Sequence, residues 1–323
     1  MASQAAVERL PTFVALEALS VLAGERPGAS VPFDATYFDG VGRATQATPD
    51  ETSAIDPETR LQQVQQSRLA LNTTSVALDA FEREEVLAAS EDLRETAEQL
   101  PEVEFLRAAF PGEVVVVPEW LRTGRMADWG MRAYFFREED APDPAEIVER
   151  NVEAEVEGNR SAFERYQGDL HGYPECCIEA FHDRAQDRPD PEWRSVESLA
   201  DEFRDEALRR GQNVSIDDVL PDFFESERAL AFFAREFFPE PDCETARAAG
   251  EEVCGALREA VGEALARDYF ALNYAFCYAV ARTLREGPPG RGGRGRPAAG
   301  DLGVEHFSFY APLSHVRTFP RYG

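Results

Sequence analysis

The segment EVVVVPEWL (113–121), followed by MRAYFFRE (131–138), decides the fold class of this chain. Valine, tryptophan, tyrosine and phenylalanine are the residue types that strands favour, and a loop that contains glycine separates the two runs. They predict a small antiparallel sheet or hairpin at about 113–138. Most of the remaining chain has the spacing of apolar residues that is typical of helices. The sequence therefore predicts an α+β protein that is predominantly helical, with a helical C-terminal domain.

Helices are expected on the N-terminal side of this hairpin. The run TFVALEALSVLA (12–23) predicts a short buried helix. A longer polar stretch, 56–100, has helical spacing, and Asp56 followed by Pro57 is typical of a helix start. The segment 43–55 between them predicts a loop.

Beyond the hairpin, prolines after acidic residues or after turns predict a series of helix starts. These starts are at Pro144, Pro174, Pro191, Pro221 and Pro241. The helix from Pro221 is expected to contain the Phe-rich segment up to residue 238. The last helical stretch, 243–285, contains YFALNYAFCYAVA (269–281), which is apolar nearly all round and predicts a central buried helix. Asn273 in that helix is expected to need a buried hydrogen-bond partner.

This pattern divides the chain into three regions. We expect an N-terminal helical region with the small β element (1–140), a helical domain with the cysteine motifs (141–286), and a flexible loop and tail (287–323). The loop GPPGRGGRGRPAAG (287–300) has too much glycine and proline to fold alone. Because it is short and has few charges, we do not expect nucleic acid to be a partner, apart from weak binding by this loop.

The charge of the chain indicates its environment. Acidic residues number 61 against 33 basic ones, the net charge is −28, and every basic residue is arginine. Molar salt shortens the Debye length to about 3 Å and screens such repulsion, so we predict a halophilic, archaeal protein. The segment MASQAAVERLPTF (1–13) does not have a basic region followed by an apolar one, and no apolar run approaches the ~20 residues of a membrane span, so we expect the protein in the cytoplasm.

Two short segments share one arrangement of proline, acidic residue and cysteine at a helix start. They are HGYPECCIEAF (171–181) and FFPEPDCETA (237–246), with Asp242 as the expected N-cap of the second helix. The positive end of a helix dipole favours thiolate over thiol, so two such helix starts predict one thiolate centre. We expect zinc or an iron–sulfur cluster there. The candidate metal ligands are Cys176, Cys177, Cys243 and His171, with His182 as a further histidine.

Adjacent cysteines project about 100° apart on a helix. Cys177 shares an apolar face with Ile178 and Phe181, which makes it the better core residue, while Cys176 faces outward and is the better ligand or nucleophile. The other two cysteines, Cys254 and Cys277, lie in Ala-rich helical surroundings and are expected to be core residues.

Three functions are compatible with these residues. The first is a protein with a thiolate metal site. The second is a non-enzymatic interaction or scaffold protein whose cysteines are simply buried. The third is an enzyme that uses Cys176 as the catalytic nucleophile, activated by His171 or His182. The sequence alone does not decide whether the protein is an enzyme.

The segment Gly172-Tyr173-Pro174-Glu175-Cys176-Cys177-Ile178-Glu179-Ala180-Phe181 resembles the G-Y-P-x-C-C-x-x-x-F signature of the prokaryotic family called domain of unknown function 483. That family has a later P-C-x-x-x-C-like segment, which is similar to residues 239–243 here. Its last cysteine corresponds to Cys243, and Glu240 stands where a first cysteine is expected. The resemblance is specific over ten residues, looser over 145–285, and implies no activity.

Overall fold

The computed structural model of the chain describes residues 12–23, 26–32, 80–123, 126–183, 190–197, 199, 201 and 226–286. The described residues form two compact units. The first contains residues 12–22 and the segments from Pro27 to Gln167, and the second contains Arg26 and the segments from Gly168 onward. The sequence placed the boundary near 140 instead; α7 (Pro144–Glu157) packs on the sheet of the first unit and so belongs to it.

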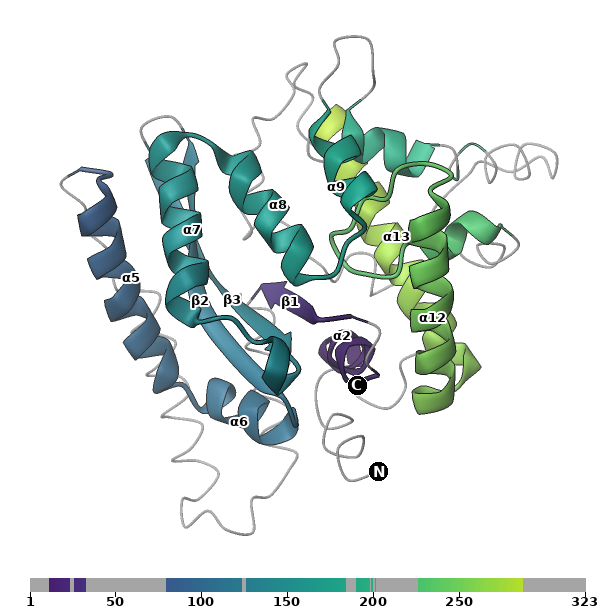
Figure 1. Ribbon diagram of the computed structural model, residues 1–323, viewed down its shortest axis with the longest axis horizontal. Helices are drawn as coiled ribbons and strands as arrows, with labels where there is room; N and C mark the ends of the chain where they lie inside the picture. The colour runs from purple at the N-terminus through teal and green to yellow at the C-terminus, as the bar shows by residue number, and fades with distance from the viewer. Residues whose placement is uncertain are drawn as a thin grey trace. The chain divides into compact units, whose positions relative to one another are not determined.

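The first unit is built around a three-stranded antiparallel sheet (Figure 1). Strands β2 (Glu113–Thr123) and β3 (Met126–Phe136) form the predicted hairpin, with Glu113 opposite Phe136. Strand β1 (Gly28–Pro32) pairs with the other side of β3, giving the order β1-β3-β2. The α+β prediction is therefore confirmed, although β1 was not predicted.

Helices cover this sheet. The helix α2 (Thr12–Leu22) confirms the predicted buried helix and packs against β1 and β3. The helix α5 (Arg83–Glu98) is the described part of the helical stretch that was predicted for 56–100. The helices α5 and α7 lie side by side along β2 (Figure 1). The short helix α6 (Pro101–Ala109) and the 3-10 turn η1 (Glu138–Asp140) flank the hairpin in sequence. The division between the two units falls within α8 (Arg160–Leu170), after Gln167.

The valine run of β2 is buried on both faces. Val114, Val115, Val116 and Val117 are each no more than 3% exposed. A continuous apolar run, in place of an alternating one, is the pattern of a strand that is covered on both sides. The run therefore fixes β2 in the core of the first unit.

The edge position of β2 leaves backbone groups that need partners, and α7 supplies them. Asn151 accepts a hydrogen bond from the Trp120 N–H (2.7 Å) and donates one to the Trp120 carbonyl oxygen (3.2 Å). Glu155 accepts from the Arg122 N–H (2.7 Å). Unpaired buried backbone groups are costly, so these two polar side chains hold α7 against the free edge of the sheet.

The second unit is helical in its described parts. It contains α9 (Glu175–His182), η3 (Glu227–Ala231), α12 (Glu244–Val261) and α13 (Glu263–Glu286). The helix α13 packs on α12 and buries Tyr269, Phe270 and Asn273 completely. Asn273 donates to the Phe232 carbonyl oxygen (3.1 Å), which supplies the partner that the sequence required.

Two expectations need correction, and three others fall on segments outside the described residues. The helical stretch predicted for 243–285 consists of two helices, because Gly262 between them has a φ of +88° and a ψ of 163°, which are not helical. The Phe-rich helix from Pro221 is wrong from residue 232 onward, because only the short turn η3 precedes an irregular segment. Residues 191–197 are helical, as Pro191 predicted. The loop and tail 287–323, the segment 43–55 and the start of the predicted helix at Asp56 lie outside the described residues.

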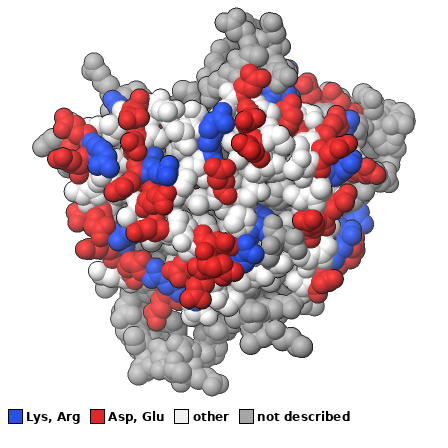
Figure 2. Space-filling view, in the orientation of Figure 1, with Lys and Arg blue, Asp and Glu red and all other residues white. Residues whose placement is uncertain are grey.

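Acidic side chains are spread over most of the described surface on the face drawn in Figure 2. Arginine side chains lie singly among them, and on this face the described residues form no continuous basic patch. Such a patch is the usual electrostatic mark of a nucleic-acid interface. The charge of this face is therefore that of a strongly acidic protein.

Candidate metal centre

The start of α9 is fixed by the three residues before the acidic Glu175. Gly172 has a φ of +70°, a left-handed conformation that glycine adopts without strain, and it turns the chain after α8. The Tyr173 ring packs on the Phe237 ring, with centroids 4.5 Å apart, and its hydroxyl donates to the Arg235 carbonyl oxygen (2.9 Å). Tyr173 thus ties the start of α9 to the segment that leads to Cys243.

Pro174 is the N-cap of α9, so Cys176 and Cys177 are the second and third residues of the helix. The Pro174 carbonyl oxygen accepts from the Cys177 N–H (2.8 Å), which closes the first turn. Both cysteines therefore lie in the first turn of a helix, as the sequence predicted.

The second helix start differs from the prediction in one respect. Cys243 itself is the N-cap of α12, and its sulfur accepts from the Ala246 N–H at 3.5 Å. Asp242, the predicted cap, has a φ of +61° and pairs with Arg228 at 2.6 Å. The proposed cap was wrong because the tight turn closed by the Cys243 N–H on the Glu240 carbonyl oxygen (3.1 Å) places Asp242 before the helix.

The two helix starts bring three cysteine side chains together. The sulfurs of Cys176, Cys177 and Cys243 all lie within 4.8 Å of one another. The Cys176 and Cys243 sulfurs, 67 residues apart in sequence, are 3.5 Å apart. This confirms that Cys176 and Cys243 meet, and the three thiols lie close enough to hold one metal ion.

The burial of the five cysteines separates two groups. Cys176 is exposed, Cys243 is half-buried and Cys177 is only 1% exposed. Cys254 and Cys277 are buried, and the Cys277 thiol donates to the Phe237 carbonyl oxygen (3.2 Å). Their expected role as core residues is supported, while Cys177 is both buried and a member of the cluster.

The three clustered thiols differ in acidity. Burial raises the pKa of Cys243, but hydrogen bonds from the Ala246 N–H and from the other two thiols outweigh it, so that its pKa is lowered. Burial and hydrogen bonding to Cys243 raise the pKa of Cys176, and burial raises the pKa of Cys177 strongly. The sequence favoured Cys176 as the reactive thiol, whereas the structure makes Cys243 the most acidic.

Glu240, which stands where the family signature has a cysteine, has another partner. Its carboxylate pairs with Arg194 at 2.9 Å, and the same guanidinium donates to the Ala180 carbonyl oxygen in α9 (2.6 Å). Arg194 thus links the end of α9 to the segment before Cys243. No local sequence pattern indicates this bridge, because Arg194 is distant in sequence from both partners.

Neither histidine belongs to the group of clustered ligands. His171 is buried, its ring lies 5.3 Å from that of Tyr173, and its carbonyl oxygen accepts from Arg26 (3.4 Å). His182 is the last residue of α9, with its ring 5.3 Å from that of Phe181. Among the described residues the ligand set is therefore three cysteines, without the His171 that the sequence suggested.

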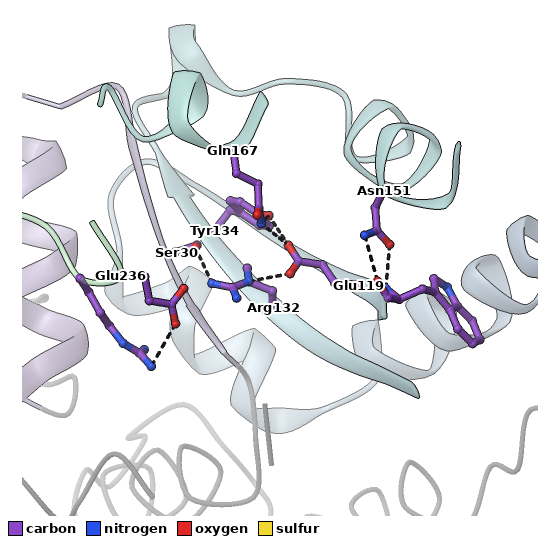
Figure 3. A network of polar contacts seen from close by, with 9 residues as sticks. Ser30, Glu119, Arg132, Tyr134, Asn151, Gln167 and Glu236 are labelled. Atoms are coloured by element: carbon purple, nitrogen blue, oxygen red, sulfur yellow. Dashed lines mark hydrogen bonds and ion pairs between the residues drawn. The ribbon is translucent and has the colours of Figure 1, made fainter. Parts of the chain in front are cut away.

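A second polar cluster, which the sequence interpretation missed, lies in the first unit. Figure 3 shows the Glu119 carboxylate among Arg132 (2.8 Å), Gln167 (2.8 Å) and the Tyr134 hydroxyl, while Arg132 also donates to Ser30 (3.1 Å). Burial and the charge of Glu119 raise the pKa of Tyr134, which keeps its hydroxyl as a donor. The alternation of Arg132 and Tyr134 along β3 is the signal that indicates this cluster.

These five residues come from β1, β2, β3 and α8, and each of the five has a partner within the cluster (Figure 3). A hydrogen-bonded network of this kind orients the elements it joins. We therefore assign the network a structural role within the first unit.

None of the described helices is both long enough and apolar enough to cross a membrane.

The resemblance to domain of unknown function 483 stays a prediction that depends on the cysteine motif. The chain matches no family model, and no curated protein or solved structure shows significant similarity to it.

Proposed function

We propose that this protein binds one zinc ion through Cys176, Cys177 and Cys243 and keeps a fourth coordination position open. The observation that carries the proposal is the convergence of three thiols from two helix starts, all within 4.8 Å. Thiolates are the ligands that zinc prefers in protein sites that lack histidine.

The distances favour a single ion over a cluster. A tetrahedral ion with Zn–S bonds of about 2.3 Å holds its sulfurs about 3.8 Å apart. The 3.5 Å between Cys176 and Cys243, and the 4.8 Å limit for the three, are close to that spacing. A [4Fe–4S] cluster binds each of its thiolates to a different iron and so requires sulfurs that are farther apart.

The local charge also suits such a centre. Three thiolates and one Zn²⁺ carry a net charge of −1. The N-terminus of α12, an 18-residue helix, lies at Cys243, and the N-terminus of α9 lies at the other two cysteines. The positive ends of helix dipoles stabilise negative charge, so these two helix starts offset the charge of the bound ion and its ligands.

The number of ligands indicates the class of zinc site. Structural zinc ions have four protein ligands, whereas catalytic ones have three and bind water or substrate in the fourth position. The two acidic residues just before Cys243 in sequence already have partners. Asp242 pairs with Arg228, and Glu240 pairs with Arg194. When bound, the ion would act as a Lewis acid on the ligand in its open position.

The test is the metal content of the full chain after purification without chelators, in molar salt and without oxygen. We expect close to one zinc ion per chain by inductively coupled plasma mass spectrometry. Cys176→Ser and Cys243→Ser should reduce the zinc content at least tenfold. Cys254→Ser is the matched control, because Cys254 is a buried cysteine of α12 outside the cluster, and it should retain the metal.

Two results would contradict the proposal. Equal zinc in the wild type and in Cys243→Ser, with both proteins folded by circular dichroism, would show that the ion binds elsewhere. Iron together with acid-labile sulfide would replace the single ion by a cluster.

A further inference from the structure

The two accessible sulfurs of the cluster form a close pair. Cys176 is exposed and Cys243 is half-buried, both are free thiols, and their sulfurs are 3.5 Å apart. A disulfide has an S–S distance of about 2.05 Å, so a modest movement of the two side chains joins them. Cys177 is only 1% exposed and is adjacent to Cys176 in a helix, where a disulfide between neighbours does not suit the backbone.

A pocket of about 200 Å³ opens beside Cys243. Phe232, Pro239 and Pro241 give it apolar walls, while Arg228 and Ser195 add polar groups. Ser195 is 4% exposed, and its hydroxyl has no hydrogen-bond partner among the residues that the structure describes. Buried polar groups normally have partners, so this hydroxyl indicates a ligand that the pocket accepts.

We propose that Cys243 and Cys176 form a dithiol that reduces a small organic disulfide docked in this pocket. The reaction uses two of the cysteines of the proposed zinc site but needs no metal. The ion and the disulfide therefore compete for the same sulfurs, and oxidation of the pair releases the metal.

The exchange proceeds in two balanced steps. The Cys243 thiolate, which lines the pocket, attacks one sulfur of the small disulfide, so that a mixed disulfide forms and the first small thiolate leaves and takes a proton. The Cys176 sulfur then attacks the Cys243 sulfur, losing its own proton to the second small thiolate as the mixed disulfide breaks. Two electrons pass from the protein to the disulfide, which becomes two thiols, and the protein retains a Cys176–Cys243 bond.

The assignment of the two roles follows from position. Cys243 is the member of the pair that lines the pocket, so it meets the incoming disulfide first. Cys176 is the nearest accessible thiol to it, which suits the second attack. Cys177 is not required in either step.

The experiment treats the full chain, with and without prior removal of metal by a chelator, with 2-hydroxyethyl disulfide in molar salt. Samples are quenched with iodoacetamide in denaturant, so that the buried thiols also react, and are measured as intact proteins by mass spectrometry. We expect the wild type to fall from five alkylated cysteines to three without keeping an adduct. A tryptic digest of the same sample should join peptide 166–184 to peptide 236–247.

Variants separate the two steps. Cys176→Ser should retain one mercaptoethanol adduct on Cys243, because the second attack is lost. Cys243→Ser should react at least tenfold more slowly, while Cys177→Ser and the control Cys254→Ser should still form the disulfide. Ser195→Ala should raise the half-saturating concentration of the disulfide at least threefold and leave the final product unchanged.

Three results would overturn the inference. They are the absence of the linked peptides in the wild type, loss of the disulfide in Cys177→Ser, and a Cys243→Ser reaction as fast as that of the wild type. Unchanged kinetics in Ser195→Ala would remove the pocket as the docking site. A disulfide in a protein that never binds zinc would refute only the proposed function, and bound zinc without a disulfide would refute only this inference.

Discussion

Replacing Gly250 by alanine tests whether α12, whose N-cap is Cys243, packs as closely on η3 as the structure describes. A Cβ atom at Gly250 would lie 1.7 Å from the Leu230 carbonyl oxygen and 2.7 Å from its carbonyl carbon. Ordinary contacts begin at 3.4 Å, so the helix must move by about 1.7 Å, the difference between the two distances. The obstacle is backbone and not a flexible side chain, so rotation of a side chain does not relieve it.

The matched control is Gly255→Ala in the same helix, where a Cβ meets nothing within 4 Å. Alanine is favoured over glycine inside a helix by about 1 kcal/mol, and both variants gain this. Overpacking of a core typically costs about 1–3 kcal/mol, and we expect a backbone clash to reach the upper end. Gly250→Ala should therefore be destabilised by about 2 kcal/mol, while Gly255→Ala is stabilised by about 1 kcal/mol.

The assay is urea denaturation in molar salt, followed by circular dichroism, with zinc content measured in parallel. Gly250→Ala should also lose zinc, because the displaced helix carries Cys243 as its N-cap. If both variants gain the same stability, α12 does not lie against η3 as described, and this account of how Cys243 is positioned is wrong.

Three further changes test other parts of the account. Asn151→Ala should lower the free energy of unfolding by about 2–3 kcal/mol in urea denaturation, because it leaves both backbone groups of Trp120 without their partner; the exposed Glu153→Ala on the same helix should change it by less than about 0.5 kcal/mol. Burial, partly offset by a backbone hydrogen bond from Arg122, raises the pKa of Glu155 in the folded protein. The folded state therefore binds this proton more tightly than the unfolded state, and the melting temperature should rise as pH falls from 7 through the raised pKa. The Glu155→Gln variant should show a smaller rise over the same interval. Dialysis from molar to about 0.1 M salt lengthens the Debye length from about 3 to about 10 Å. Repulsion between the acidic residues of this chain, whose net charge is −28, should then reduce its helicity as measured by circular dichroism. Full helicity in low salt would contradict the halophilic interpretation.

The strongest local signals in the sequence predicted the corresponding elements. The valine run of 113–121 gave β2, and Asp143 followed by Pro144 gave α7, with the Asp143 side chain accepting from the Ala145 N–H as expected of an N-cap. The strand β1 was missed because GASVP is only five residues long and has glycine at one end and proline at the other, and it becomes a strand through its pairing with β3.

The Phe-rich segment shows why local patterns fail. Phe232 packs on Tyr274 (5.0 Å between centroids), and Phe237 packs on Tyr173 (4.5 Å). These tertiary contacts hold the rings in an irregular segment after η3, although their spacing also fits a helix. Burial of the rings against distant residues outweighs the weak helical preference of the segment.

The candidate site could be predicted in part. The shared order of proline, acidic residue and cysteine indicated that Cys176 and Cys243 meet, because both follow a recognisable helix start. The sequence could not indicate that Tyr173 and Arg194 tie these starts together, since their partners are distant in sequence. It also could not identify Cys243 as the most acidic thiol, because hydrogen bonds from the other two cysteines contribute to its lowered pKa.

X-ray absorption at the zinc K-edge of the purified full chain tests the central claim most directly, because it measures the ligands of the ion itself. Three thiolates and one exchangeable ligand predict a shell of three sulfur atoms at about 2.3 Å and one lighter atom at about 2.0 Å. The Cys243→Ser protein, reloaded with zinc, should lose one sulfur from this shell. A shell of nitrogen and oxygen atoms alone, or scattering from a second metal, would contradict a single ion held by Cys176, Cys177 and Cys243.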